Sequence, residues 1–437
     1  MIQFTKRPFF FTELFFLLFM ICYAFMVGVV PGRVVTLMAV CAVGMFGIDA
    51  IRYNMLDRML SGILPFLPWI AFVVLSYLVL PLVPYAGSRA WNNLTGVLFA
   101  LTVFMIVRRF GGVPIISSFF MVYVLFVLVF YILFPGLLGA APALGQERLA
   151  LGSGDMGDVG GWNNPNDVAR LMGLSALVIL GGIKHFPQKL FLSRGWLGTL
   201  TLLFKYVSVL VAIYIIIFYS GSRSALIWVL AILGYSFASF FNKNIFLAIF
   251  LAVACSGPIL LAAFLIFPEV EIFSRITVLF DEVAMRGKGE SSFLTRGNMI
   301  KDALSMWMDS PIWGNGNEAF RVEAGYGTYS HCNYTELLAN YGLLGLTLFY
   351  LPIGIGVFEA WKMRLSANDE VRKQAIWLMI CFALLFLVSF PNIIYYAKYM
   401  LLFYGILLGR LYYLKDNYQR MNAVHRMPGM GGRRRRF

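Results

Sequence analysis

Charged residues are scarce in this sequence. Asp, Glu, Lys and Arg together make up 13% of its 437 residues, whereas 60% are hydrophobic and the mean hydropathy is +0.79. This balance excludes an ordinary soluble globular protein. The sequence also lacks a phosphate-binding P-loop, a dinucleotide-binding fingerprint and a nucleophile elbow. Enzyme classes that depend on those motifs are therefore not favoured.

Residue types that bind metals are few, and their spacing matches no metal site. Asp155, Asp158 and Asp167 do not have the spacing of a calcium-binding loop. The adjacent pair His331–Cys332 lacks the usual spacing of zinc ligands. We therefore expect neither a metal nor a cofactor.

Long apolar runs dominate the chain. They form about twelve blocks of roughly 17–25 residues, long enough to cross a bilayer core as helices. Helices satisfy their own backbone hydrogen bonds in lipid, and the alternating pattern of a membrane β-barrel is absent. The sequence therefore predicts an all-α, polytopic integral membrane protein that forms a single domain over residues 1–437. The predicted spans lie near residues 9–29, 34–51, 63–83, 92–107, 113–134, 165–183, 199–219, 224–241, 244–267, 333–358, 374–390 and 394–414.

Basic residues fall in alternate connecting segments, from Lys6 near the start to Arg433–Arg436 in the tail, residues 415–437. By the positive-inside rule, this alternation places both termini and the basic tail in the cytoplasm. The long segments 135–164 and 268–332 then face outward, the second of them before the tenth span. The basic anchors favour membrane lipids as partners, and we expect no nucleic-acid partner.

The second outward segment is predicted to contain an amphipathic helix that Arg296 opens. Asp309-Ser310-Pro311 ends this helix. We expect it to lie on the outer membrane surface or against the helix bundle. Its apolar face recurs at helical spacing and comprises Met299, Ile300, Ala303, Leu304 and Trp307.

His331 is the main catalytic candidate, because it lies in a polar, Gly-rich segment just before an apolar run. An imidazole there suits a general base near neutral pH. The alternative is a histidine that merely faces solvent or lipid headgroups. Glu336 follows one turn later and either orients the imidazole or pairs with an arginine.

Arg223 and Arg296 are candidates for anion binding. Arg223 lies in a short turn between two apolar blocks, in a stretch without Asp or Glu from 168 to 268. A guanidinium at the membrane edge is costly unless it meets an anion. The alternatives are a salt bridge to a distant carboxylate or snorkelling for Arg223, and a solvated surface position for Arg296. Three further arginines share the large outward segment and compete for the same role, namely Arg275, Arg286 and Arg321.

Several stretches resemble the O-antigen ligase and polymerase superfamily of bacterial envelope glycosyltransferases. The likeness is carried by SGSRSA at 220–225, by TRGNMIKDALSMWMDSPIWGNGNEAF at 295–320, by SHCNYTELLANYGLLGLTLF at 330–349 and by NNPND at 163–167. The resemblance implies an inner-membrane enzyme that takes a glycan from undecaprenyl pyrophosphate on the periplasmic face. It further implies an inverting, metal-independent transfer.

In this family arginines hold the pyrophosphate and a loop histidine acts on the acceptor, roles that match Arg223, Arg296 and His331. Many relatives have an asparagine directly after the histidine, whereas here Cys332 comes before Asn333. We take Asn333 and Glu336 as substrate-binding candidates beside the arginines.

The resemblance leaves the acceptor open. The leading hypothesis is an O-antigen ligase that transfers the glycan to lipid A-core in lipopolysaccharide biosynthesis. One rival is a polysaccharide polymerase whose acceptor is a second lipid-linked repeat, and another is a protein O-oligosaccharyltransferase. A more distant alternative, from a different class, is a transporter for an anionic lipid. Its charged residues would lie at mid-membrane depth, whereas the candidate charges here lie at the outward ends of the predicted helices.

Overall fold

The computed structural model describes residues 10–25, 32–52, 63–78, 86–110, 113–133, 165–184, 196–219, 225–238, 292–390 and 392–425. Within these ranges the protein is helical and contains no strand. The elements are α1 (Phe10–Phe25), α2 (Gly32–Arg52), η1 (Leu64–Phe66), α4 (Leu67–Leu78), α5 (Ala86–Phe110), α6 (Val113–Leu133), α7 (Pro165–Lys184), α8 (Trp196–Tyr214), the π-helix η3 (Ile215–Tyr219), α9 (Ala225–Ala238), α12 (Ser292–Asp309), α13 (Ala319–Glu323), α14 (Asn333–Met363), α15 (Asp369–Val388) and α16 (Lys398–His425).

The all-α prediction is confirmed for the described residues. Each predicted span in these ranges coincides with a helix, while the block at 244–267 and the first outward segment lie outside them. Among the described residues, five helices are long and apolar enough to cross a membrane, and four shorter apolar helices accompany them. The protein is therefore polytopic, and the count of twelve spans stays a prediction. α16 continues to His425, so it extends past the predicted span 394–414 into the predicted tail.

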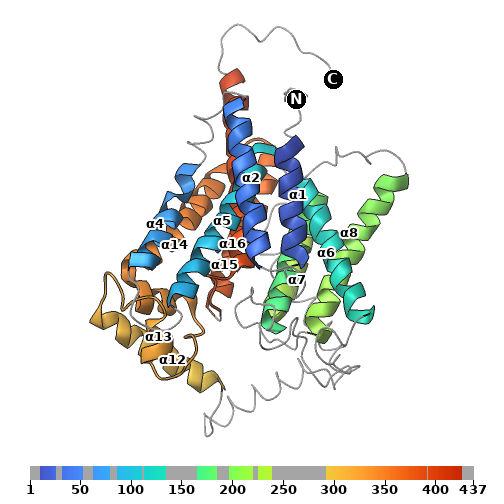
Figure 1. Ribbon diagram of the computed structural model, residues 1–437. Coiled ribbons are helices and arrows are strands. Elements are labelled where there is room, and N and C mark those ends of the chain that lie inside the picture. Colours follow the sequence, from blue (N-terminus) through green and yellow to red (C-terminus); the bar gives the residue numbers. More distant parts are fainter. Residues whose placement is uncertain are drawn as a thin grey trace.

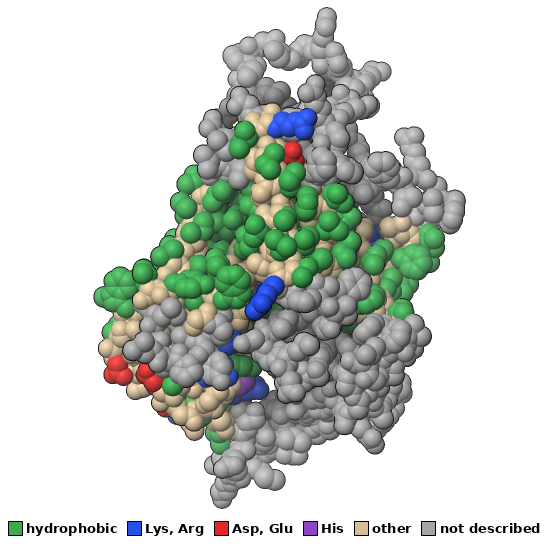
Figure 2. Space-filling model, in the orientation of Figure 1, with side chains coloured by type: hydrophobic (Ala, Val, Ile, Leu, Met, Phe, Trp, Pro, Cys, Tyr) green, Lys and Arg blue, Asp and Glu red, His purple; other side chains and the backbone are tan. Residues whose placement is uncertain are grey.

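Figure 1 shows α12 and α13 at one end of the bundle, below α4 and α14, with α6, α7 and α8 on the opposite side. Figure 2 shows apolar side chains across the middle of the visible face, with the acidic ones toward its two ends. This distribution is expected of a bundle whose middle lies in hydrocarbon, because charged groups there are costly.

α5 and α16 pack closely at the centre of the bundle. A Cβ atom on Gly405 would lie 2.3 Å from the carbonyl oxygen of Ala100, and one on Gly409 would lie 2.9 Å from that of Phe104. Gly405 and Gly409 are four residues apart and so lie on one face of α16. Small residues at this spacing let two membrane helices approach to backbone contact.

α14 is broken into two helical parts at Gly342, where φ is 64° and ψ is −165°. The turn between α12 and α13 fills this break. The amide groups of Leu343 and Leu344 donate to the carbonyl oxygens of Pro311 (2.8 Å) and Ile312 (3.1 Å). The turn therefore caps the first N–H groups of the second part, residues 343–363, which would otherwise lack partners.

The same turn also caps the first part of α14, residues 333–341. The amides of Asn315 and Gly316 each donate over 2.9 Å to the carbonyl oxygens of Ala339 and Asn340. The Gly-rich sequence after α12 and the Asn-Tyr-Gly sequence in α14 are thus two halves of one joint.

α12 packs against the first part of α14. Its buried residues Met299 and Ala303 meet Phe320 and Ala339 in a small apolar cluster. The predicted end at Asp309 is confirmed, and the predicted apolar face is confirmed for Met299 and Ala303, whereas Ile300, Leu304 and Trp307 are only partly buried. The predicted start is wrong, since α12 begins at Ser292 and Arg296 lies in its second turn. The residues from Ser292 to Arg296 include no helix breaker, so the helix can begin before Arg296. A positive charge near the N-terminus of a helix opposes the helix dipole, and this cost is smaller in the second turn than in the first.

Candidate active site

His331 lies in the loop directly before α14, in an unusual backbone conformation. Its φ is 58°, and Glu318 is the other residue besides glycine with positive φ in the described part of the chain. The ring packs against Tyr329 with a centroid distance of 4.5 Å. Non-glycine residues adopt this conformation rarely, and surrounding contacts must hold them there. The backbone at His331 is thus held by its surroundings, and the imidazole packs on one side against Tyr329.

The electrostatic environment keeps His331 neutral. Burial lowers its pKa to about 4, with further contributions from the positive charges of Arg296 and Arg170. A neutral imidazole near pH 7 has one nitrogen free to accept a proton. The predicted neighbour Arg296, on the exposed side of α12, is therefore close enough to act on His331.

Arg170 is a second cation of this site, contributed by α7. Its side chain is buried. One terminal nitrogen donates to the hydroxyl of Tyr399 over 3.1 Å, and the other donates to the side-chain oxygen of Asn392. These contacts fix the place of the guanidinium. Asn392 belongs to the connector between α15 and α16, residues 389–397, which also contacts the start of α14, and Tyr399 follows it in the first turn of α16.

Asn333 joins this connector to the first turn of α14. Its backbone amide donates to the carbonyl of Ser389 over 2.9 Å. Its side-chain oxygen accepts from the amides of Ile394 (2.7 Å) and Tyr395 (3.0 Å), and its Nδ2 donates to the hydroxyl of Tyr350 (2.8 Å). The residue is fully buried. These bonds engage the amide from both sides and place Asn333 in the framework two residues after His331.

Glu336 holds the residue before His331. Its carboxylate accepts from the backbone amide of Ser330 over 2.6 Å and from Nδ2 of Asn340 over 3.4 Å. The side chain is buried, with 1% of its surface exposed. The sequence suggested that this acid orients the imidazole or pairs with an arginine. In the structure its hydrogen bonds instead fix the loop backbone.

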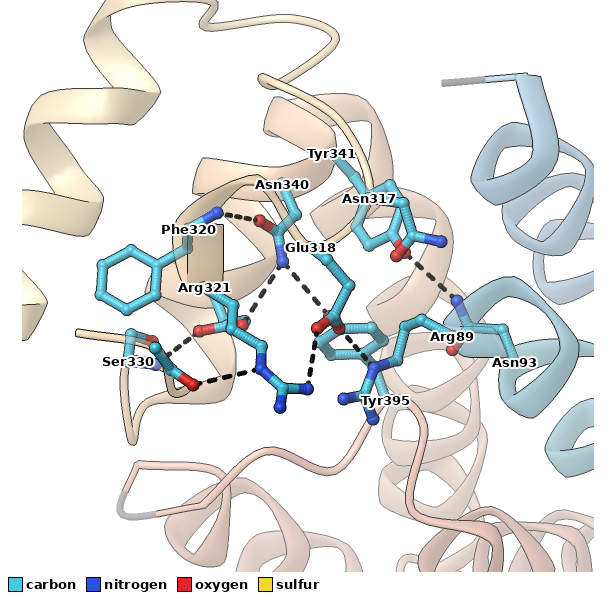
Figure 3. Close-up of polar contacts among 12 residues, drawn as sticks. Arg89, Asn93, Asn317, Glu318, Phe320, Arg321, Ser330, Asn340, Tyr341 and Tyr395 are labelled. Atoms are coloured by element: carbon cyan, nitrogen blue, oxygen red, sulfur yellow. Dashed lines mark hydrogen bonds and ion pairs between the residues drawn. The ribbon is translucent and has the colours of Figure 1, made fainter. Parts of the chain in front are cut away.

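A buried ion pair links α5 to the loop that precedes α13 (Figure 3). Nε of Arg89 donates to Glu318, whose side chain is 3% exposed, and the Arg89 guanidinium lies 3.5 Å from the ring centroid of Tyr396. Glu318 also pairs with Arg321 over 3.4 Å. Arg321 donates in turn to the carbonyl of Gly327 over 3.2 Å. The predicted competitor Arg321 therefore braces the loop.

Two asparagines in the same view tie the joint to these charges. Nδ2 of Asn340 lies 3.3 Å from the hydroxyl of Tyr395, and its Oδ1 accepts from the amide of Phe320 over 3.0 Å (Figure 3). The hydroxyl of Tyr341 donates to Asn317 over 2.5 Å. Polar bonds thus connect the segment 314–330 to α14 at residues 315–320 and again at Ser330.

The structure brings together some of the predicted residues. His331, Asn333 and Glu336 lie within one short segment, and Arg296 acts on His331 from α12. Arg223 lies outside the described residues, as do Arg275 and Arg286. The described residues hold no cluster of three or more His, Cys, Asp or Glu side chains that would bind a metal ion.

Arg170, Arg89 and Glu318 belong to the site but were not predicted from the sequence. Arg170 and Arg89 are cations within or beside apolar blocks, which is a recognised sign of function in membrane helices. That signal is present in the sequence for both. Glu318 gives no local signal, because its partner Arg89 is 229 residues away.

These features define the class of protein: a polytopic helical membrane protein with a histidine and several arginines gathered at one end of the bundle. The O-antigen ligase family model (Wzy_C) matches residues 207–350, which include Arg223, Arg296 and His331. The resemblance is thereby confirmed over this segment, and the family comprises membrane enzymes that transfer lipid-linked glycans. No curated protein matches the chain.

Proposed function

We propose that this protein is an O-antigen ligase. It transfers a glycan from undecaprenyl pyrophosphate to lipid A-core on the periplasmic face of the inner membrane. The observation that carries the proposal is His331, held neutral and fixed in position beside Arg170 and Arg296, within a segment that matches the ligase family. A neutral base next to permanent cations suits a reaction whose donor is an anionic diphosphate.

The acceptor hydroxyl oxygen attacks the anomeric carbon of the donor sugar and forms the new glycosidic bond. The bond from that carbon to the diphosphate oxygen breaks, and the diphosphate leaves with the electron pair. His331 takes the proton of the attacking hydroxyl. Attack from the face opposite the leaving group inverts the anomeric configuration.

Arg296, Arg223 and Arg170 would stabilise the charge that develops on the leaving diphosphate. Because diphosphate is already a good leaving group, this arrangement needs no metal for its departure. Arg170 enters this proposal from its place beside His331, and Arg223 enters from the family motif.

Donor binding also prepares the base. Arg296 and Arg170 contribute to the low pKa of His331. A bound diphosphate would offset their charge and so raise the pKa of His331, although burial, the larger cause of the low pKa, would remain. A base whose pKa is closer to the working pH takes up a proton more effectively. The site thus becomes competent when the donor is in place.

Glu336, Asn333 and the Arg89–Glu318 pair would act on the reaction indirectly. They fix the backbone on both sides of His331 and anchor the preceding loop. We therefore assign them as positioning residues, and the substrate-binding expectation for Glu336 and Asn333 receives no support from their burial.

The acceptor is tested by reconstitution in proteoliposomes. The donor is undecaprenyl-pyrophosphate-linked glycan, and separate reactions contain lipid A-core, a second lipid-linked repeat or a Ser/Thr-containing acceptor protein. Glycan on lipid A-core is the expected result. Glycan found on the second repeat alone would make the protein a polymerase, and glycan on the protein alone would make it an oligosaccharyltransferase.

A further inference from the structure

The second part of α14 carries a stripe of exposed apolar side chains. Leu343, Leu351, Ile355 and Phe358 recur at intervals of eight, four and three residues, which places them on one face of the helix. This part of α14 belongs to a helix that is long and apolar enough to cross a membrane. The stripe is therefore the side that this helix turns toward lipid.

The turn after α12 carries two more exposed apolar side chains next to the start of this part of α14. Ile312 and Trp313 are 61% and 56% exposed, although both are large and apolar. Their position along the axis of α14 is fixed by the hydrogen bonds that the amides of Leu343 and Leu344 donate to the carbonyl oxygens of Pro311 and Ile312. Ile312 and Trp313 thus lie level with the first residues of the membrane-crossing part.

A second exposed tryptophan marks the other end of the same helix. Trp361 is 48% exposed, and the guanidinium of Arg364 lies 3.4 Å from its ring centroid. The roughly 18 residues between Leu343 and Trp361 span about 27 Å at the helical rise of about 1.5 Å per residue. A bilayer hydrocarbon core is about 30 Å thick, and tryptophans concentrate at its two boundaries.

We infer that Ile312 and Trp313 form a membrane anchor, seated at the lipid headgroup boundary of the leaflet on the His331 side. The occupant of this surface is lipid, because the two residues are large, apolar and exposed at the level where the membrane-crossing part of α14 begins. The segment Ser310–Gly314 has no charged side chain, which suits insertion at this depth.

The anchor fixes the depth of the site, a consequence that rests on the proposed function. The first part of α14, residues 333–341, is about 13 Å long. His331 lies two residues before Asn333 and so no more than about 20 Å from the level of the anchor. The headgroup region begins at the hydrocarbon boundary, so the anchor would limit how far His331 can stand from the layer that holds a lipid-linked diphosphate.

The anchor is tested by tryptophan fluorescence in vesicles of phosphatidylcholine brominated at different acyl positions. The contribution of each tryptophan is the spectrum of the full-length protein minus that of its Trp→Phe variant. Trp313→Phe and Trp361→Phe report the two boundaries, and Trp377→Phe reports a fully buried control in α15.

The Trp313 and Trp361 contributions should be quenched strongly by bromines near the glycerol end and less by bromines near the methyl end, with Trp377 least affected. If the Trp313 contribution is unquenched, protein or solvent covers the patch and the inference is wrong. If bromines near the methyl end quench it best, the turn lies in the hydrocarbon interior, and the inference is equally wrong. Neither readout depends on glycan transfer.

A second arm measures the consequence for the site. Trp313→Glu should raise the KM for lipid-linked donor in vesicles while the variant still purifies as a folded protein. Trp313→Tyr keeps an interfacial side chain and should behave as wild type. An unchanged KM for Trp313→Glu refutes the link between anchor and site, even if the quenching result holds.

Discussion

Gly342→Ala should destabilise the protein by several kcal/mol, because three effects coincide at this position. The backbone conformation at Gly342 is essentially restricted to glycine, and forcing another residue into such a region costs about 1–3 kcal/mol. The new Cβ would lie 2.3 Å from the carbonyl oxygen of Ile312 and 2.6 Å from the amide of Gly314. Both contacts are with backbone, which moves only if the joint opens.

Opening the joint breaks the hydrogen bonds that Leu343 and Leu344 donate to the turn, each worth about 1 kcal/mol. The total loss is then about 3–5 kcal/mol. Gly354→Ala is the matched control in the same helix, because no atom lies within 4 Å of the position that its new methyl group would occupy. Alanine there is favoured over glycine by about 0.5–1 kcal/mol.

The assay is thermal unfolding in detergent, followed by transfer at a temperature where each variant is folded. Gly342→Ala should melt well below wild type, and Gly354→Ala should melt at or above it. Gly314→Ala, whose Cβ would lie 2.4 Å from the amide of Tyr341, should behave like Gly342→Ala. Because the two glycines face one joint, the double variant should lose less stability than the two single variants lose in sum. If Gly342→Ala has the same melting temperature as Gly354→Ala, the close approach at the joint is refuted.

Three further predictions concern the site. The pH dependence of kcat/KM should rise with pH through the low pKa of His331, because only the neutral imidazole accepts a proton. Arg170→Gln should move this acidic limb to higher pH, because it removes a positive charge near His331. Arg410→Gln changes another buried arginine that is bonded to an amide, and it should leave the limb in place. If the limb lies at the same pH in both variants, Arg170 does not act on the pKa of His331. Glu318→Gln should lower the free energy of unfolding by about 3 kcal/mol, measured by thermal unfolding, because it leaves the largely buried guanidinium of Arg89 without its charged partner. An unchanged melting temperature would contradict the role of this pair in holding the loop. Asn333→Ala should lower kcat more than it changes the KM for donor, since it frees the backbone beside His331; the reverse pattern, a raised KM at unchanged kcat, would return Asn333 to direct substrate binding.

The helices were predictable because hydrophobicity and length are properties of contiguous sequence. A block such as 113–134 is long and apolar, and it becomes α6, Val113–Leu133. The same reasoning found the end of α12, where proline cannot continue a helix. It placed the start of α12 too late, because no sharp signal precedes Arg296.

The break in α14 was not predictable from hydrophobicity. Residues 333–358 form one apolar block in the sequence, and Gly342 alone does not distinguish a break from an ordinary glycine in a membrane helix. The break depends on a partner turn about thirty residues earlier. Only the three-dimensional contact between Gly342 and Gly314 shows why both glycines are needed.

The candidate site was predictable in part for the same reason. His331 and Arg296 stood out as isolated chemical groups, and a family motif gave them roles. Glu336 and Asn333 were correctly placed near His331, but their hydrogen bonds run to backbone and buried side chains. The contacts of Arg170 with Tyr399 and Asn392 join residues more than two hundred positions apart. No local pattern encodes such pairs.

His331 is proposed to drive the transfer of a lipid-linked glycan to lipid A-core. The most direct measurement follows both products in proteoliposomes that contain wild type or His331→Ala at equal amounts of folded protein. Wild type should release one undecaprenyl pyrophosphate for each glycosylated lipid A-core, with inverted anomeric configuration, and His331→Ala should form neither product. Equal formation of both products by His331→Ala would contradict the account.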